Sequence, residues 1–235
     1  MPQPYFQFKQ FTVWHDKCAM KVGTDGVLLG AWAPVGSAKH ILDVGTGTGL
    51  VALMLAQRTR KASIIALEID REAAMQAQEN VERSPWRERI EVIQADFNHY
   101  HSPLKYDLIV SNPPYFVDSL ESPDQKRNCA RHNGHLTYEE LLKGVAELLS
   151  PQGIFTLVIP SDAAGYVTES AAKYALYPSQ QLLVITKIND APKRTLISFT
   201  FEKQECHTEH LLTEIARHQY SEEYIRLTKD FYLKM

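Results

Sequence analysis

One stretch of the chain decides its fold: Ile41-Leu42-Asp43-Val44-Gly45-Thr46-Gly47-Thr48-Gly49-Leu50. Its apolar beginning is typical of a buried strand, and it turns through three glycines into a helical pattern. Glycine lacks the Cβ atom that would keep a ligand away from the backbone, and a helix N-terminus offers free N–H groups. The stretch therefore predicts a strand, a ligand-binding turn and a helix in direct succession.

The spacing of these glycines, and the acid before them, indicate what the turn binds. A dinucleotide-binding loop has the spacing G-x-G-x-x-G, whereas here the glycines follow G-x-G-x-G and Leu50 occupies the third glycine position of the longer motif. The carboxylate of Asp43 would repel a pyrophosphate and attract a positively charged ammonium group. A cationic ligand is therefore favoured, and a dinucleotide-dependent oxidoreductase is the weaker hypothesis.

Outward from this stretch, short runs of β-branched and apolar residues alternate with helical patterns. This alternation predicts an α/β fold, a Rossmann-like, doubly wound, mostly parallel seven-stranded sheet. The last two strands are too close in sequence for a crossover helix, so we expect them to form an antiparallel hairpin. Thr137 and Asp162 are placed to act as N-caps. The expected strands are 40–44, 63–67, 90–94, 106–110, 153–159, 181–186 and 196–201, and the expected helices are 50–58, 72–83, 138–149 and 163–176.

The composition fits an ordinary globular protein and excludes several other classes. The chain has 235 residues, of which 44% are apolar and 23% are charged, enough for one large α/β domain. Its formal charge of −3 means that any nucleic-acid site is a local patch. Three scattered cysteines favour neither a disulfide framework nor a four-cysteine zinc site. No run is apolar enough for a membrane span and the start lacks a signal-peptide layout, so we expect a cytoplasmic protein with no membrane partner; no oligomer is implied.

Three segments are distinguished along the chain. Residues 1–39 open with aromatic side chains and are interpreted as an N-terminal flap or cap. Residues 40–205 contain the alternating pattern and are expected to form the ligand-binding catalytic domain. Residues 206–235 are expected to be a C-terminal helical extension of that domain.

Acidic residues follow the next two strands. Glu68 ends the second strand, 25 positions after Asp43, where a carboxylate can accept hydrogen bonds from both hydroxyls of a ribose. Asp70 is better interpreted as the N-cap or first-turn acid of the next helix. Asp96 ends the third strand and can accept from an adenine amino group, while the apolar Phe97 can cover the ring. Any one of these acids taken alone could equally be a solvated strand-end or turn residue.

The most specific signal is Asn112-Pro113-Pro114-Tyr115, which follows the fourth expected strand. Two prolines fix the backbone and remove two donors, which leaves carbonyl oxygens presented at the strand's end. The side-chain oxygen of Asn112 and the carbonyl of Pro113 can accept both hydrogens of a planar amino group, and Tyr115 can stack on its ring. The tetrapeptide therefore predicts a site that orients an aromatic or amide NH₂ group.

These motifs, in this order, resemble those of class I S-adenosylmethionine-dependent methyltransferases. Their first motif, D-x-G-x-G-x-G, is matched from Asp43 to Gly49, and the tetrapeptide resembles the N-P-P-Y motif shared by adenine-N6, guanine-N2 and protein glutamine-N5 methyltransferases. The resemblance implies that S-adenosyl-L-methionine is the cofactor. The residues that it implies as cofactor-binding are Asp43, Gly45, Gly47, Gly49, Glu68, Asp96, Phe97 and Asn112, and those that it implies as catalytic are Asn112, Pro113, Pro114 and Tyr115.

Two further segments narrow the resemblance within that class. Residues 19–33 and 220–224 are similar to those of bacterial tRNA adenine-N6 methyltransferases, which modify the adenine beside the anticodon, at position 37 of tRNA-Val. The resemblance implies tRNA as substrate and places four more residues over the cofactor: Lys21, Gly23, Thr24 and Asp25. Methylation of adenine N6 or guanine N2 in ribosomal RNA or DNA stays an alternative. A protein glutamine methyltransferase is disfavoured, because those enzymes carry an N-terminal helical domain and only 42 residues precede Asp43.

Contacts to RNA are sought among basic loops. The loop after the tetrapeptide contains Lys126, Arg127 and Arg131, and the hairpin connection contains Lys193 and Arg194; all five are candidate phosphate ligands. The histidines and cysteines do not form four-ligand patterns, so no metal is predicted. An alternative of another class is a noncatalytic S-adenosylmethionine-binding module, against which the intact tetrapeptide argues.

Overall fold

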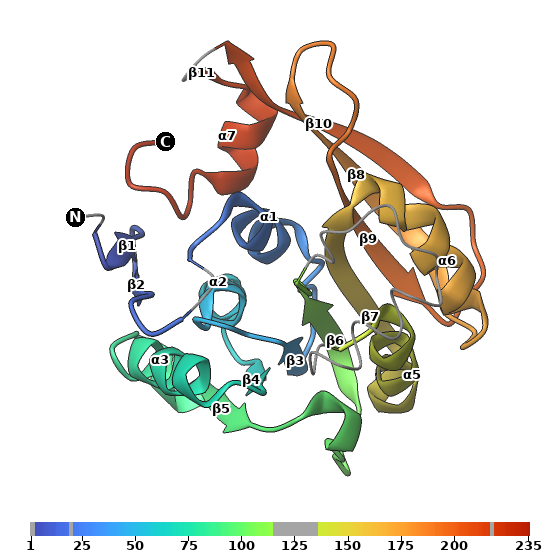
Figure 1. The fold of residues 1–235 in the computed structure, drawn as a ribbon, viewed down its shortest axis with the longest axis horizontal. Coiled ribbons are helices and arrows are strands. Elements are labelled where there is room, and N and C mark those ends of the chain that lie inside the picture. Colours follow the sequence, from blue (N-terminus) through green and yellow to red (C-terminus); the bar gives the residue numbers. More distant parts are fainter. Residues whose placement is uncertain (1–2, 19–20, 115–135, 217–218) are drawn as a thin grey trace.

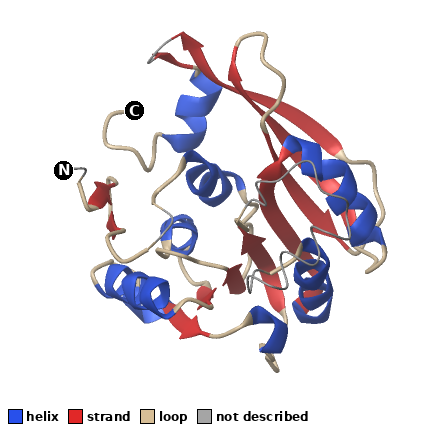
Figure 2. Cartoon of the chain, viewed as in Figure 1, coloured by secondary structure: helices blue, strands red, loops and turns tan. Residues whose placement is uncertain are grey.

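Helices cover both faces of a nine-stranded sheet in the computed structural model, which describes residues 3–18, 21–114, 136–216 and 219–235 (Figure 1; Figure 2). The strands are β1 (Tyr5–Gln7), β2 (Thr12–Trp14), β3 (His40–Val44), β4 (Ser63–Glu68), β5 (Ile90–Gln94), β6 (Tyr106–Ser111), β7 (Leu149–Pro160), β8 (Tyr177–Lys187), β9 (Arg194–Thr200), β10 (His207–Ala216) and β11 (Gln219–Tyr220). The helices are α1 (Thr24–Trp32), α2 (Leu50–Arg58), α3 (Arg71–Glu82), α5 (Tyr138–Leu148), α6 (Ala164–Ala172) and α7 (Glu222–Thr228), with 3-10 turns at Arg87–Arg89, Phe97–His99 and Ser161–Ala163.

The strand order in the sheet is β11-β10-β8-β9-β7-β6-β3-β4-β5. β3 pairs in parallel with β4 on one side and β6 on the other, so the chain reverses its direction of travel across the sheet at this point. A crevice outside the carboxyl ends of two such strands is the usual ligand site of a doubly wound fold. β9 runs antiparallel to β7 and β8, which confirms the predicted hairpin.

The two faces of the sheet bury separate apolar clusters. Helices α5 and α6 pack on one face, together with the inward side chains of β7 and β9. Helices α1, α2 and α7 and the aromatic residues of the N-terminal segment pack on the other. Strands that are buried on both faces have nearly continuous apolar sequences, and this pattern predicts the central strands. The fold class predicted from the sequence is confirmed.

The predicted boundaries agree most closely where short-range chemistry sets them. β3, β5 and α2 coincide with the expected ranges 40–44, 90–94 and 50–58. Thr137 caps α5 in a capping box with Glu140: its hydroxyl accepts from the Glu140 N–H, while the Glu140 carboxylate accepts from the Thr137 N–H. Asp70 caps α3 by accepting from the N–H of Ala73 at 2.8 Å.

The prediction that Asp162 caps a helix is wrong. Residues Ser161–Ala163 form a 3-10 turn that runs directly into α6, so the residue at the N-cap position is Ala163, in a helical conformation and with no side-chain cap. A 3-10 turn at a helix start tightens the backbone without the extended residue that a capping carboxylate requires.

The tail after residue 205 differs from the expected helical extension, because its first part is the ten-residue strand β10. β10 pairs in parallel with β8, and β11 pairs with β10 in turn, so the described chain has nine strands in the sheet where seven were expected. The first four residues of β10 are exposed and polar, and inward-facing burial begins only at Leu211. An edge strand of this kind lacks the apolar alternation by which strands are recognised.

The N-terminal segment belongs to the same core as the rest of the fold. Phe8 is buried and stacks on Phe11 and Tyr232, at centroid distances of 4.6 and 5.8 Å. The N–H of Lys9 donates to the carbonyl of Phe231 at 2.8 Å, so the two ends of the described chain lie side by side (Figure 1). The apolar cluster on this face contains residues of all three predicted segments. The division of the chain at residues 39 and 205 stays a prediction. Within the described residues, no helix is long and apolar enough to cross a membrane.

Candidate active site

The glycine-rich turn between β3 and α2 has the backbone that its sequence predicts. Gly45, Gly47 and Gly49 all have positive φ, at 71°, 56° and 81°, a region that side-chain-bearing residues seldom adopt. A Cβ atom built on Gly45 would meet nothing within 4 Å, so the backbone there faces open space. Gly49 instead serves as the N-cap of α2 and approaches Ala77 of α3. The turn is therefore a cradle at Gly45 and Gly47, while Gly49 serves helix packing.

Asp43 lies beneath this turn. It is 1% exposed, and its Oδ2 accepts from the hydroxyl of Thr46 at 2.6 Å and from the N–H of Ala52 at 3.1 Å. Burial raises the pKa of this carboxyl from an ordinary value of 3.8 to about 7, and the charge of Glu68 adds to the rise. Asp43 lines neither of the cavities described below. In the structure Asp43 therefore holds the turn to α2, and its expected contact with a cationic ligand stays a prediction.

Glu68 stands at the carboxyl end of β4, as predicted. Its Oε2 accepts from the N–H of Gly47 at 2.8 Å and its Oε1 accepts from the N–H of Asp70 at 3.0 Å. The side chain is nearly buried, yet it lines the larger cavity. Two backbone donors fix the carboxylate, and each of its oxygens keeps a lone pair for a further donor.

Asp96 and Phe97 follow β5 and line the same cavity. Asp96 accepts from the N–H of Asn98 at 2.9 Å and contacts Nδ1 of His99 at 3.0 Å. Phe97 is buried, and a Cβ atom on Gly144 of α5 would lie only 2.5 Å from its ring. The glycine in α5 is thus the residue that makes room for the aromatic ring at this end of the cavity.

A cavity of about 630 Å³ runs along the carboxyl ends of β3 to β6. One end is formed by Asp96 and Phe97, the middle by Glu68, and the other end by Asn112. The sequence-predicted residues that it brings together are Gly45, Gly47, Glu68, Asp96, Phe97, Asn112, Pro113 and Pro114.

A second cavity of about 230 Å³ adjoins the first at the end of β6. It is lined by Lys21, Gly23 and Asp25 from the segment before and within α1, and it shares the glycine turn and Asn112 with the larger cavity. Thr24 does not line it and faces a different cavity. The lysine–glycine–aspartate part of the predicted N-terminal set therefore lines the smaller cavity, and the junction of the two cavities is formed by the glycine turn and Asn112.

The Asn112-Pro113-Pro114 turn is placed by β6. The hydroxyl of Ser111, the last residue of that strand, donates to the carbonyl of Val44 at 2.9 Å, which fixes the end of β6 against β3. Asp107, near the opposite end of β6, accepts from the N–H groups of Lys39 and His40. Tyr115, with Lys126, Arg127 and Arg131, lies outside the described residues.

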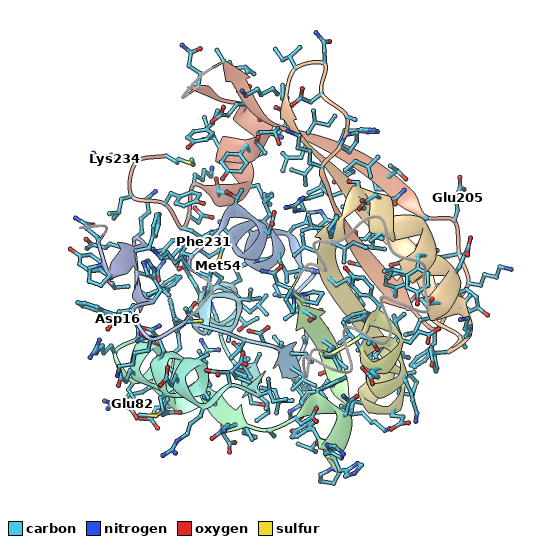
Figure 3. All side chains as sticks on the ribbon, viewed as in Figure 1. Asp16, Met54, Glu82, Glu205, Phe231 and Lys234 are labelled. Carbon is cyan, nitrogen blue, oxygen red and sulfur yellow. The ribbon has the colours of Figure 1, made fainter. Side chains whose placement is uncertain are left out.

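The residues that close the cavity from the N-terminal side were not predicted from the sequence. Lys17 and Cys18 line it, and this segment is held on α3 by buried amide side chains: Oε1 of Gln76 accepts from the Lys17 N–H at 3.1 Å. Figure 3 shows Asp16 of this segment beside α3. Gln76 and Asn80 are each 1% exposed. The sequence contains a signal that could have predicted their burial: both lie on the same helix face as the inward-facing Ala73 and Ala77.

Of the five predicted phosphate ligands, Lys193 and Arg194 lie within the described residues. Lys193 is exposed and lies 3.7 Å from Asp190. Arg194 donates from Nε to Oδ2 of Asp25 at 3.1 Å, which ties the start of β9 to α1. Arg194 therefore shapes the site in addition to any phosphate contact. Among the described residues, no group of three histidine, cysteine or acidic side chains could hold a metal ion.

The fold and the site together define a class I methyltransferase. A solved structure with this fold, described as a predicted O-methyltransferase, protein Atu636 from Agrobacterium tumefaciens, is 16% identical and covers 88% of this chain and 96% of its own, with a TM-score of 0.67. The glycopeptide N-methyltransferase MtfA, solved in complex with S-adenosyl-L-methionine, is 14% identical and covers 77% of this chain and 99% of its own, with a TM-score of 0.56. Residues 22–168 match the model of the methyltransferase small domain.

A curated relative gives the particular family. The tRNA1(Val) (adenine(37)-N6)-methyltransferase of Bacteroides fragilis (strain YCH46) is 69% identical over 238 residues, which cover 100% of each chain. This chain belongs to the family of tRNA1(Val) (adenine(37)-N6)-methyltransferases.

Proposed function

We propose that this protein transfers the methyl group of S-adenosyl-L-methionine to N6 of adenine 37 in tRNA1(Val). The observation that carries the proposal is the position of Asn112-Pro113-Pro114, which lines both cavities at the end of β6. One cavity is large enough for the cofactor's nucleoside, and the junction of the two is where a methyl donor and an amino acceptor meet. The family relationship supplies the tRNA and the position of the base.

The residues of the larger cavity fit the proposed cofactor. The Gly45 cradle admits a ligand against the backbone, and Glu68 offers carboxylate oxygens to a ribose. Asp96 and Phe97 offer an acceptor and an apolar surface for adenine. Lys21 and Asp25, which line the smaller cavity, are suited to the carboxylate and ammonium groups of an amino acid. When bound, the cofactor supplies an electrophilic methyl group on a sulfonium.

The chain's own contribution to the reaction is orientation of the acceptor. The lone pair of an adenine amino group is delocalised into the ring, which makes its nitrogen a poor nucleophile. The side-chain oxygen of Asn112 and the carbonyl oxygen of Pro113 accept its two hydrogens, so that the lone pair is directed out of the ring plane. The proline pair makes this geometry rigid, and Tyr115 is proposed to stack on the base.

The target base must leave its stack to reach this junction. An anticodon-loop adenine is single-stranded, so extruding it costs less than flipping a paired base. We place the reaction in the cytoplasm, where the chain would meet tRNA. Of the predicted phosphate ligands, Lys193 is exposed beside the site, and the other lysine and arginines of the set stay predictions.

The experiment that tests this function is methyl transfer to defined RNA. Wild-type protein, labelled S-adenosylmethionine and a tRNA1(Val) transcript are expected to give N6-methyladenosine on nucleoside analysis. The matched control transcript carries guanine at position 37 and should stay unlabelled. Equal labelling of the two transcripts, or label only in ribosomal RNA, DNA or protein, would overturn the substrate and leave the fold as described.

A further inference from the structure

A third cavity, of about 960 Å³, lies beyond Asp25 on the side away from the glycine turn. Its walls come from β1, α1, the ends of β8 and β9, β10, β11, α7 and the tail after α7, elements that meet on the side where the two chain ends lie (Figure 1). The reaction proposed above uses none of this space. Its lining nevertheless has a distinct composition, with five aromatic rings and three cationic side chains.

The aromatic residues offer a stacking surface. Tyr220 is 41% exposed, and its ring lies on that of the buried Tyr224 at a centroid distance of 5.1 Å and an interplanar angle of 30°. An exposed ring held flat by a buried one is a ready platform for a nucleobase, because every base presents a π face. The remaining rings of the lining are Tyr5, Phe6 and Tyr232.

The charges around the cavity suit a nucleic-acid backbone. The three cations are Lys193, Arg194 and Lys234, and Figure 3 shows Lys234 on the tail that rims this side of the molecule. The two acidic side chains of the lining are Asp25 and Glu214. Asp25 pairs with Arg194 at 3.1 Å, so its charge is compensated by a neighbouring residue of the lining. The side chains of the lining sum to a formal charge of one positive, and the exposed Lys193 lies 3.7 Å from Asp190 outside the lining.

The cavity borders the methyl-transfer site. Asp25 lines both this cavity and the 230 Å³ cavity that ends at Asn112. The Asp25–Arg194 ion pair is thus the partition between them. A strand of RNA whose target amine lies at Asn112 would have its neighbouring nucleotides beside this partition.

We propose that this third cavity binds unstacked nucleotides adjacent to the target adenine in single-stranded RNA, with a base on Tyr220 and phosphates on Lys193 and Lys234. The inference rests on the proposed function and deepens it, by assigning the part of the substrate that lies outside the catalytic pocket. Sequence-specific recognition of RNA loops commonly stacks such splayed bases on aromatic side chains.

The test uses the full chain and an anticodon stem-loop of tRNA1(Val) with 2-aminopurine next to position 37. Tyr220→Ala is compared with Tyr166→Ala, which removes an equally exposed tyrosine, 42% against 41%, from α6 on the opposite face of the sheet. Tyr220→Ala is expected to raise the KM for tRNA roughly five- to a hundredfold, as for loss of one base stack, with the KM for S-adenosylmethionine unchanged. Tyr220→Phe should retain wild-type values, and Tyr166→Ala should change neither.

A direct binding measurement separates this inference from the proposed function. Wild-type protein should quench the 2-aminopurine fluorescence by stacking, and Tyr220→Ala should abolish the quenching while its thermal unfolding midpoint stays that of Tyr220→Phe. Lys193→Ala and Lys234→Ala should each weaken binding and reduce its salt dependence. If Tyr220→Ala binds and methylates tRNA as Tyr166→Ala does, the cavity is not an RNA site. If wild-type protein methylates no tRNA at all, the proposed function fails first.

Discussion

The side chain of Asn80 holds both backbone polar groups of Trp14, 66 positions away in sequence. Its Oδ1 accepts from the Trp14 N–H at 2.9 Å, and its Nδ2 donates to the Trp14 carbonyl at 2.8 Å. The same Nδ2 donates to the carbonyl of Thr48 in the glycine turn at 2.9 Å. One buried amide therefore connects the segment that closes the larger cavity with the glycine turn that lines it.

Asn80→Ala is expected to lower both stability and cofactor affinity. Each buried group left without its partner costs about 1–3 kcal/mol, so the free energy of unfolding should fall by at least ~2 kcal/mol. Urea unfolding and calorimetric titration with S-adenosylhomocysteine measure the two effects. The control is Gln78→Ala, exposed on the same helix, which should stay within about 0.5 kcal/mol of wild type. Unchanged cofactor affinity in Asn80→Ala would show that the N-terminal segment does not shape the cofactor site.

Asn112→Ala is expected to abolish transfer while preserving cofactor binding. The substitution removes an acceptor for the target amine, and loss of orientation of this kind costs roughly a hundredfold or more in rate. Single-turnover methylation of tRNA gives the rate, and titration with S-adenosylhomocysteine in the same variant gives the affinity. A variant that transfers methyl at the wild-type rate would remove Asn112 from the catalytic site.

Gly144→Ala is expected to disturb the adenine end of the cavity. A Cβ at this position would lie 2.5 Å from the Phe97 ring, so the ring must move, at a cost of about 1–3 kcal/mol in stability. The matched control is Gly165→Ala in α6, where a Cβ meets nothing within 4 Å. Because alanine has the higher helix propensity, this control should raise the free energy of unfolding by about 0.5–1 kcal/mol. Calorimetry should also show weaker cofactor binding in Gly144→Ala alone.

A double variant tests whether the loss of stability in Gly144→Ala comes from the contact between the new methyl group and the Phe97 ring. A leucine in place of Phe97 has no atoms at the far side of the ring, so Gly144→Ala should cost less in a Phe97→Leu background than in wild type. Equal costs in the two backgrounds would show that the ring is not what the new methyl group meets.

Asp43 is expected to make stability depend on pH in a direction opposite to that of most carboxylates. Its pKa is about 7 in the folded protein against 3.8 as its ordinary value, so the folded state binds the proton more tightly. The stability of wild type relative to Asp43→Asn should therefore fall as the pH rises from about 4 to about 7, and level off above. Urea unfolding of both proteins at intervals of one pH unit measures the difference. A difference that stays constant from about pH 5 to about pH 7 would mean that the buried carboxyl is ionised throughout this range.

Local patterns predicted those parts of the molecule that depend on neighbours in sequence. The strand at 40–44, the helix at 50–58 and the cap at Thr137 follow from apolar runs, glycine positions and a capping box, each complete within a few residues. Order along the chain was enough to place Glu68 and Asn112 at one edge of the sheet, because parallel strands bring their carboxyl ends together.

The features that were not predicted depend on partners far apart in sequence. Asp43 is the acidic residue of the glycine motif, but the motif does not predict which atoms surround its carboxylate. The packing of α2 decides this, and it leaves Asp43 buried and bonded to the N–H of Ala52. β10 has no apolar alternation of its own and is a strand because β8 offers it an edge. The third cavity gathers residues from both ends of the chain, a juxtaposition for which no local pattern exists.

The packing of Phe8 against Tyr232 has a consequence for the order of folding during synthesis. Phe8 leaves the ribosome early, but the residues that bury its ring and accept the Lys9 N–H are made more than 220 positions later. Until then the Phe8 ring lacks Tyr232, one of the rings on which it stacks, and in the growing chain the parallel strands can assemble before that contact forms. Translation of Phe231 and Tyr232 is therefore the event that completes the contacts of Phe8 and Lys9 in the first segment made.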